Sequence, residues 1–156
     1  MVEPEIHAHA SAPGGGVHGE IRGRDDVEIY FSSGFYGEAS EAELEQRLEA
    51  LFRLLWVEFE KARQRGQQVY ADNSEVTDAD RRFFKERDAL VAEGGSDDAR
   101  ITITAQGLQP WRVHITDGTV RALREPEFCA GIQTAAARLI NDRLAQAIQL
   151  RGRIYR

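Results

Sequence analysis

The chain has 156 residues, of which 42% are hydrophobic and 29% are charged, the balance of a soluble globular protein. Its one cysteine, Cys129, excludes an intramolecular disulfide. No apolar run approaches the roughly 20 residues of a membrane helix, and the first residues lack the pattern of a secretory signal. We therefore expect a single cytoplasmic domain that does not contact a membrane.

Charge divides the chain into two parts of opposite sign. Residues 100–156 contain 9 basic and 4 acidic residues, whereas residues 1–99 contain 11 basic and 22 acidic residues, and the whole chain has a net charge of −6. Such a division is typical of a protein whose basic part binds a partner or folds against its own acidic part. Both interpretations remain open at this point.

The N-terminal region predicts a tail followed by two strands. Residues 1–16 are small and glycine-rich and include His7 and His9, which predicts a disordered, solvated tail rather than a metal site. Alternating residues predict a strand over 27–31. Residues 17–22 are its weaker partner across a turn.

The clearest helix is predicted over residues 40–65. Ser40 and Glu43 have the spacing of a capping box, and apolar residues follow at intervals of three and four. Because the apolar arc is wide, we expect that either a partner protein or the chain's own sheet and second helix cover it. The residues predicted for a partner interface are Leu44, Leu51, Phe52, Leu55 and Trp56.

A second helix is predicted over residues 77–93, where Thr77 and Asp80 have the spacing of another helix cap. Residues 94–98 are rich in Gly and Asp and predict a linker. The domain, residues 17–156, is thereby divided into an acidic strand–helix–helix part over 17–93 and a basic part over 100–156.

The basic part predicts three antiparallel strands and a closing helix. Alternation predicts strands over 101–105 and 111–116, and Asp117-Gly118 predicts a type I′ hairpin into a third strand over 119–123. Pro126 is a favourable first residue for a helix over 126–150. The predicted fold class is therefore α+β, an antiparallel meander flanked by long amphipathic helices.

A faint internal repeat is visible in this order of elements. A strand, a short loop and a long helix occur twice, and the two copies end in Arg-Gly-Gln-Gln-Val-Tyr (65–70) and Arg-Gly-Arg-Ile-Tyr (151–155). A match this short arises by chance as readily as by duplication, so both explanations remain open.

The sequence contains no convincing catalytic, metal or cofactor constellation, so we expect a protein that is not an enzyme and that binds no metal or cofactor. Cys129 lies in the first turn of the last predicted helix, where the helix dipole can lower a thiol pKa. A nucleophile also needs a base, and the candidates are His114 and His18. A buried, unreactive Cys129 and a surface His114 are the favoured interpretation.

A three-stranded meander flanked by long helices resembles the YbaB/EbfC nucleoid-associated family. The residues that carry the resemblance are the strands over 101–105, 111–116 and 119–123 and the helix over 126–150, with 40–65 or 77–93 as the first helix. Ser40-Glu-Ala42 and Val76-Thr-Asp-Ala-Asp80 are also similar to stretches of YbaB-like proteins found beside actinobacterial type VII secretion systems. The chain departs from the family in its length, in its extra strand–helix unit and in its acidity.

The resemblance implies a subunit made of a helix, three antiparallel strands and a second helix, and a homodimer whose subunits share a sheet and exchange helix contacts. It also implies DNA binding through diffuse contacts. The negative net charge opposes such binding, which depends on phosphate neutralisation. The alternative is a protein–protein adaptor or chaperone, for example a secretion-associated one, that uses the apolar surface of helix 41–65. The candidate phosphate contacts are Arg112, Arg121, Arg138, Arg143, Arg151 and Arg153.

Overall fold

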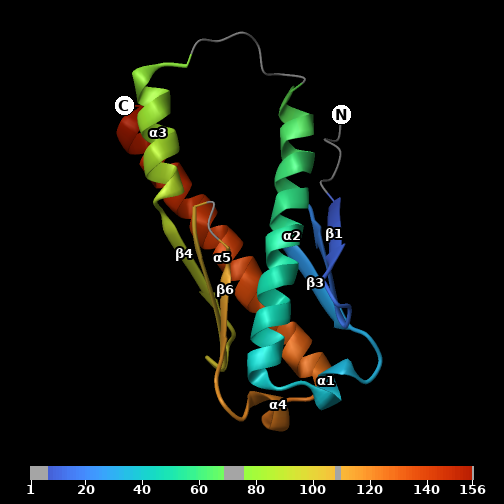
Figure 1. Cartoon of the computed structure of the whole chain (residues 1–156). Coiled ribbons are helices and arrows are strands. Elements are labelled where there is room, and N and C mark those ends of the chain that lie inside the picture. Colours follow the sequence, from blue (N-terminus) through green and yellow to red (C-terminus); the bar gives the residue numbers. More distant parts are fainter. Residues whose placement is uncertain (1–6, 69–75, 108–109, 156) are drawn as a thin grey trace.

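The computed structural model describes residues 7–68, 76–107 and 110–155, with backbone alone for 63–68, and shows an α+β protein (Figure 1). Two separate antiparallel sheets, each of three strands in the order of the chain, are accompanied by two long helices. In chain order the elements are β1 (His7–Ser11), β2 (Val17–Arg22), β3 (Asp26–Phe31), α1 (Phe35–Glu38), α2 (Glu41–Gln68), α3 (Asp78–Asp88), β4 (Val91–Gly95), β5 (Ile101–Gln106), β6 (Arg112–Ile115), α4 (Thr119–Ala122) and α5 (Glu125–Ile154).

The chain is a tandem repeat of one unit, three antiparallel strands followed by a short helix and a long helix. The first repeat runs from β1 to α2 and the second from β4 to α5, and the strand registers coincide after a shift of 84 residues. The short helices begin alike, because Gly34 (φ 82°) and Gly118 (φ 87°) both precede them in the left-handed region that favours glycine. The structure therefore shows a repeated arrangement of elements, but its register differs from the match between 65–70 and 151–155. Part of that match also lies outside the described residues.

The two repeats are joined by reciprocal contacts. Each long helix packs on the first two strands of its own repeat and against the third strand of the other, α2 on β6 and α5 on β3. Tyr36 in α1 donates its hydroxyl hydrogen to the carbonyl of Leu123 (2.7 Å) and lies 3.4 Å from that of Val120, its own counterpart in the second repeat. Contact between counterparts is what a two-fold arrangement produces near its axis. The apolar faces of both long helices are thereby covered within one chain.

Core volume is distributed differently in the two repeats. Leu51 of α2 is fully buried opposite Gly19 of β2, where an added Cβ would lie 3.1 Å from the Leu51 side chain. At the corresponding places the second repeat has the small Ala135 on its helix and the large Ile103 on its strand, both also fully buried. One repeat therefore places the large side chain on the helix and the other places it on the strand, so that the filled volume is similar although the residues differ.

The structure corrects the prediction for the N-terminus and for residues 77–98. Residues 7–11 of the predicted tail form β1, which pairs with β2, whereas residues 1–6 lie outside the described part. The helix from Thr77 ends at Asp88 and β4 follows, so the predicted linker is the end of β4 and its turn into β5. Residues alternate between exposed and buried along β4, so the chain from Val91 onward is a strand rather than a continuation of the helix.

The predicted hairpin at Asp117-Gly118 is also wrong, and residues 119–122 form one helical turn, α4. The edge of β6 that a third hairpin strand would need is occupied by α2. The carboxylate of Glu45 accepts a hydrogen bond from the backbone N–H of Ile115 (2.8 Å). Gly118 therefore turns the chain into α4 and away from the sheet, and the meander consists of β4, β5 and β6.

Other predicted elements are confirmed. The strands at 17–22 and 27–31 and both long helices are present with nearly the predicted bounds. The hydroxyl of Ser40 accepts a hydrogen bond from the N–H of Glu43, and Thr77 and Asp80 form a complete capping box. Among the described residues, no helix combines the length and apolar character that crossing a membrane requires.

Candidate nucleic-acid interface

α3 and the last turns of α5 lie side by side at the end of the molecule remote from α1 and α4, the end at which α2 also terminates (Figure 1). The Tyr155 hydroxyl donates a hydrogen bond to the Asp80 carboxylate, and the rings of Phe83 and Tyr155 lie 5.9 Å apart. Leu150 of α5 is 2% exposed. We call α3 together with residues 147–155 the arm.

The hydrogen bond from Tyr155 is accompanied by matching shifts in pKa. The hydroxyl of Tyr155 and then the backbone N–H of Thr77 hold the pKa of Asp80 below its usual range, because both bind the ionised carboxylate. The same bond raises the pKa of Tyr155, because the hydroxyl must keep its hydrogen to donate it. At neutral pH the Asp80 carboxyl is ionised and the Tyr155 hydroxyl is protonated, as this hydrogen bond requires. The bond therefore joins the start of α3 to the end of α5.

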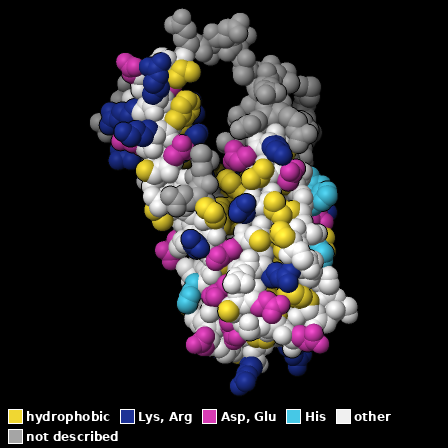
Figure 2. All heavy atoms as spheres, viewed as in Figure 1, with side chains coloured by type: hydrophobic (Ala, Val, Ile, Leu, Met, Phe, Trp, Pro, Cys, Tyr) yellow, Lys and Arg dark blue, Asp and Glu magenta, His cyan; other side chains and the backbone are white. Residues whose placement is uncertain are grey.

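Basic side chains gather on the arm, and Figure 2 shows them over α3 and the end of α5 at the upper left. Four carboxylates accompany them, and some form exposed pairs within α3, Arg81 with Asp78 at 2.8 Å and Arg82 with Glu86 at 3.5 Å. Pairs this exposed are worth little and are readily exchanged for a phosphate. The basic residues of the arm are Arg81, Arg82, Lys85, Arg87, Arg151 and Arg153.

Aromatic rings alternate with these cations. The guanidinium of Arg87 lies 5.7 Å from the ring centre of Phe83 and 5.2 Å from that of Phe84, and Arg151 lies 5.8 Å from the ring of Tyr155. Phe84 and Tyr155 are each 42% exposed. Exposed rings among arginines are the combination that single-stranded or unpaired bases stack on, while the cations contact phosphates.

The structure separates the six arginines predicted as phosphate contacts. Arg151 and Arg153 belong to the arm. Arg138 bonds the Gly95 carbonyl (2.8 Å) and the Asp97 carboxylate (2.5 Å). Arg143 bonds the Gly107 carbonyl (3.3 Å) and lies 5.1 Å from the ring centre of Trp56. Arg138 and Arg143 therefore serve contacts within the chain.

The remaining two predicted arginines lie elsewhere. Arg112 on β6 is exposed, with Glu49 of α2 4.0 Å away, and Arg121 lies on α4 at the opposite end from the arm. The six residues therefore do not form one surface. The basic residues of α3 were missed because they belong to a part of the chain that is acidic on average. The available signal was the run Arg81-Arg82-Phe83-Phe84-Lys85, in which cations flank adjacent aromatic residues.

Most of the residues predicted for a partner interface are buried in the chain's own core. Leu44, Leu51 and Leu55 are fully buried and Phe52 is 1% exposed, whereas Trp56 is only partly buried. β1, β2 and β6 cover this face of α2. The sequence left open whether a partner protein or the chain's own elements cover this apolar arc. In the structure, elements of the same chain cover it.

Cys129 and His114 do not form a catalytic pair in the described structure. Burial, with a smaller effect from Glu125, raises the pKa of the Cys129 thiol to about 12, so the group is protonated at neutral pH. His114 is exposed on β6 with the Glu45 carboxylate 3.7 Å away. Across residues 7–68, 76–107 and 110–155, no three His, Cys, Asp or Glu side chains are grouped so as to hold a metal ion.

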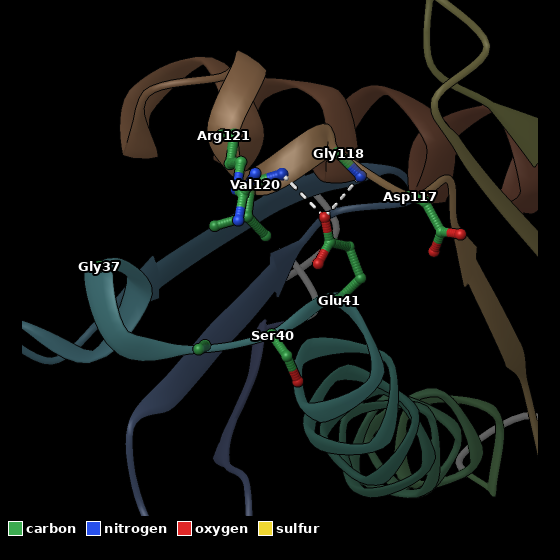
Figure 3. A pocket seen from close by; sticks show the side chains of 8 residues that line it. Gly37, Ser40, Glu41, Asp117, Gly118, Val120 and Arg121 are labelled. Atoms are coloured by element: carbon green, nitrogen blue, oxygen red, sulfur yellow. Dashed lines mark hydrogen bonds between the residues drawn. The ribbon is translucent and has the colours of Figure 1, made fainter.

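A polar cavity of about 480 Å³ lies where the two repeats meet, between α1, the start of α2 and α4 (Figure 3). Glu41 points across it and accepts hydrogen bonds from the backbone N–H groups of Gly118 (2.8 Å) and Val120 (3.4 Å). Its own backbone N–H, with those of Val120 and Gly118, holds the pKa of Glu41 below its usual range. The backbone N–H groups at the start of α4 therefore already bind a carboxylate of the chain itself. The cavity marks where the two repeats meet and is not a site for an external anion.

Comparison with family models, with curated proteins and with solved structures finds no match to this chain.

Proposed function

We propose that this chain is a non-enzymatic, DNA-associated protein of the YbaB/EbfC kind. The observation that carries the proposal is the arm, where six basic side chains and two exposed aromatic rings share one end of the molecule. Phosphate contacts of this kind position a protein on nucleic acid without reading its sequence. The arm is positively charged, with six basic and four acidic residues, although the whole chain has a net charge of −6.

The order of elements supports the family resemblance. From α3 to α5 the chain is a helix, three antiparallel strands and a second helix, which is the subunit that the resemblance implies. The resemblance also implies exchanged helix contacts between two subunits, and here α2 and α5 exchange contacts between two repeats. The two sheets are separate rather than shared, which is a departure from that expectation.

The test is a titration of the full chain against a labelled duplex at two salt concentrations. With about four phosphate contacts, raising the salt from about 50 to about 200 mM lowers the affinity roughly 100-fold. The variant Arg151→Gln/Arg153→Gln should reduce the slope of log affinity against log salt by about two.

The matched control removes two charges at the opposite end, Arg100→Gln/Arg121→Gln, and should keep the native slope. The carbonyl of Arg100 accepts the N–H of Thr116, three residues before α4 begins, which places Arg100 toward that end of the molecule. Equal effects of the two variants would mean that the arm has no special role. No binding at low salt would refute DNA association altogether.

The second candidate function is the protein–protein adaptor. It is favoured by the outer side of α2, where Leu54 is 38% exposed and Val57 is 46% exposed. These residues, unlike most of the predicted interface, are available to a partner. The same titration separates the candidates, since an adaptor has no salt-dependent affinity for DNA.

A further inference from the structure

The outer edges of the two sheets differ in how they are closed. A strand at a sheet edge presents unpaired backbone N–H and C=O groups, and these groups pair with another strand unless something covers them. The two sheets have four such edges, β1 and β3 in the first repeat and β4 and β6 in the second. Three of the four are hydrogen-bonded by side chains from a long helix.

The outer edge of β4 is covered by a row of α5 side chains spaced one helical turn apart. Close approach of α5 makes this possible, because Gly94 contacts the backbone of Ala135 and Leu139 with no side chain between them. The bonds run from Arg138 to the Gly95 carbonyl (2.8 Å), from the Glu93 N–H to Asp142 (2.9 Å) and from Gln146 to the Val91 carbonyl (2.9 Å).

The edges of β3 and β6 are covered by the helix of the other repeat. Gln133 of α5 accepts a hydrogen bond from the N–H of Ile29 in β3 (2.8 Å). Glu45 of α2 does the same for Ile115 in β6. Both strands also pack against these helices, β3 on α5 and β6 on α2.

Within the described part of the chain, the edge of β1 is open. Since Ala8, Ala10 and Ala12 pair with β2, the backbone groups of His7, His9 and Ser11 point outward. No side chain of the described residues bonds these outward groups. In α2 the counterparts of the covering row are Leu54, Glu58 and Ala62, and Glu58 lies 3.5 Å from Lys61.

We propose that β1 pairs antiparallel with β1 of a second copy of this chain, about a two-fold axis at His9. In this register His9 exchanges both backbone hydrogen bonds with His9 of the partner subunit, and His7 pairs with Ser11 of the partner subunit. The two three-stranded sheets then form one continuous sheet of both copies. The contact is isologous, so it closes at two subunits.

The composition of β1 favours an identical strand over a foreign one. His-Ala-His-Ala-Ser contains no residue with a fixed charge, so like charges do not oppose each other when the strand meets its own copy. Its small side chains form no deep pocket that would select a different partner. The neighbouring Leu54 is exposed in place of the arginine that covers β4, and a strand added at this edge covers it.

The test is sedimentation velocity of the full chain over a concentration series at about pH 8. We expect a reversible dimer. His9→Pro removes only an outward N–H, since the inward bonds belong to the alanines, and should raise the dissociation constant at least tenfold. Leu54→Arg/Ala62→Gln gives α2 the two side chains that cover the edge of β4 in the second repeat. This variant should also raise the dissociation constant at least tenfold. Circular dichroism and thermal melting of the monomer should be unchanged.

Gln46→Arg adds the same charge at another exposed position of α2 and should leave the dissociation constant unchanged. A chain that is monomeric up to about 100 μM would overturn the proposal, and so would a dimer that neither variant weakens. A monomer that binds an extended peptide instead would assign the edge to a different partner and would equally overturn it. None of these outcomes depends on DNA binding, which the proposal places on the arm.

Discussion

The close approach of α5 to β4 gives the sharpest test of the packing. An added Cβ at Gly94 would overlap the carbonyl oxygen of Ala135 and lie 2.5 Å from the backbone nitrogen of Leu139. Both are backbone atoms of α5, so no side-chain rotation relieves the overlap and the helix must move away from the sheet. Gly94→Ala therefore tests whether this contact holds α5 in place.

The cost can be estimated from the structure. Overpacking a core typically costs 1–3 kcal/mol, and each edge hydrogen bond lost when α5 moves adds roughly 0.5–1.5 kcal/mol. We expect a loss of about 3 kcal/mol in the free energy of unfolding, which lowers the melting temperature by roughly 6–12 °C for a chain of this size.

The matched control is the neighbouring Gly95→Ala. There an added Cβ lies 3.6 Å from the Ile101 carbonyl oxygen, an ordinary contact. This change should be neutral or stabilise by up to about 1 kcal/mol, because alanine reduces the entropy of the unfolded chain. Chemical and thermal unfolding of both variants measure the difference. If Gly94→Ala is as stable as Gly95→Ala, the close contact between β4 and α5 is not present.

Three further predictions concern single side chains. Tyr36→Phe leaves the Leu123 carbonyl without its donor and should cost roughly 1–2 kcal/mol in thermal unfolding, whereas Tyr30→Phe, at an exposed position, should be neutral. The Ser96 hydroxyl and then the Arg100 N–H hold the pKa of Asp98 below its usual range. The stability that its carboxylate contributes is therefore present at neutral pH and lost as pH falls through the lowered pKa. Asp98→Asn should accordingly destabilise at pH 7, and its difference in unfolding free energy from the native chain should shrink as the pH falls through that pKa. Cys129, with a pKa raised to about 12, should react with iodoacetamide at pH 8 over 100-fold more slowly than free cysteine, and rapid labelling of the folded chain would contradict its burial.

The sequence predicts the elements whose signals are local. The helix 40–65 has its cap and its apolar stripe in adjacent turns, and strand 27–31 has clean alternation, so both are confirmed. β1 was missed because its inward residues are alanines, which bury little area and resemble a flexible tail. It is a strand because β2 supplies its hydrogen bonds and α2 covers its alanines, and both are contacts with other elements.

The errors in the second repeat also have a non-local cause. Asp117-Gly118 is a strong hairpin signal, yet Glu45, 70 residues earlier, occupies the edge that a hairpin would use. The candidate site was missed for a similar reason. The cations of α3 and those at the end of α5 are far apart in sequence, and their joint charge is visible only after α3 folds against α5.

The open edge belongs to the first repeat, whereas the arm consists of α3, which connects the two repeats, and the end of the second repeat. The number of arms per assembly therefore depends on β1. A dimer through β1 carries two arms, and a duplex long enough to reach both converts the second contact into an intramolecular one. On a duplex of about 40 base pairs, His9→Pro should therefore bind at least tenfold more weakly than the native chain. On a duplex of about 12 base pairs, which accommodates one arm, the two proteins should bind equally. Equal affinity on both lengths would show that the arms act independently even if the dimer forms, and weaker binding on both would indicate that the variant has damaged the arm.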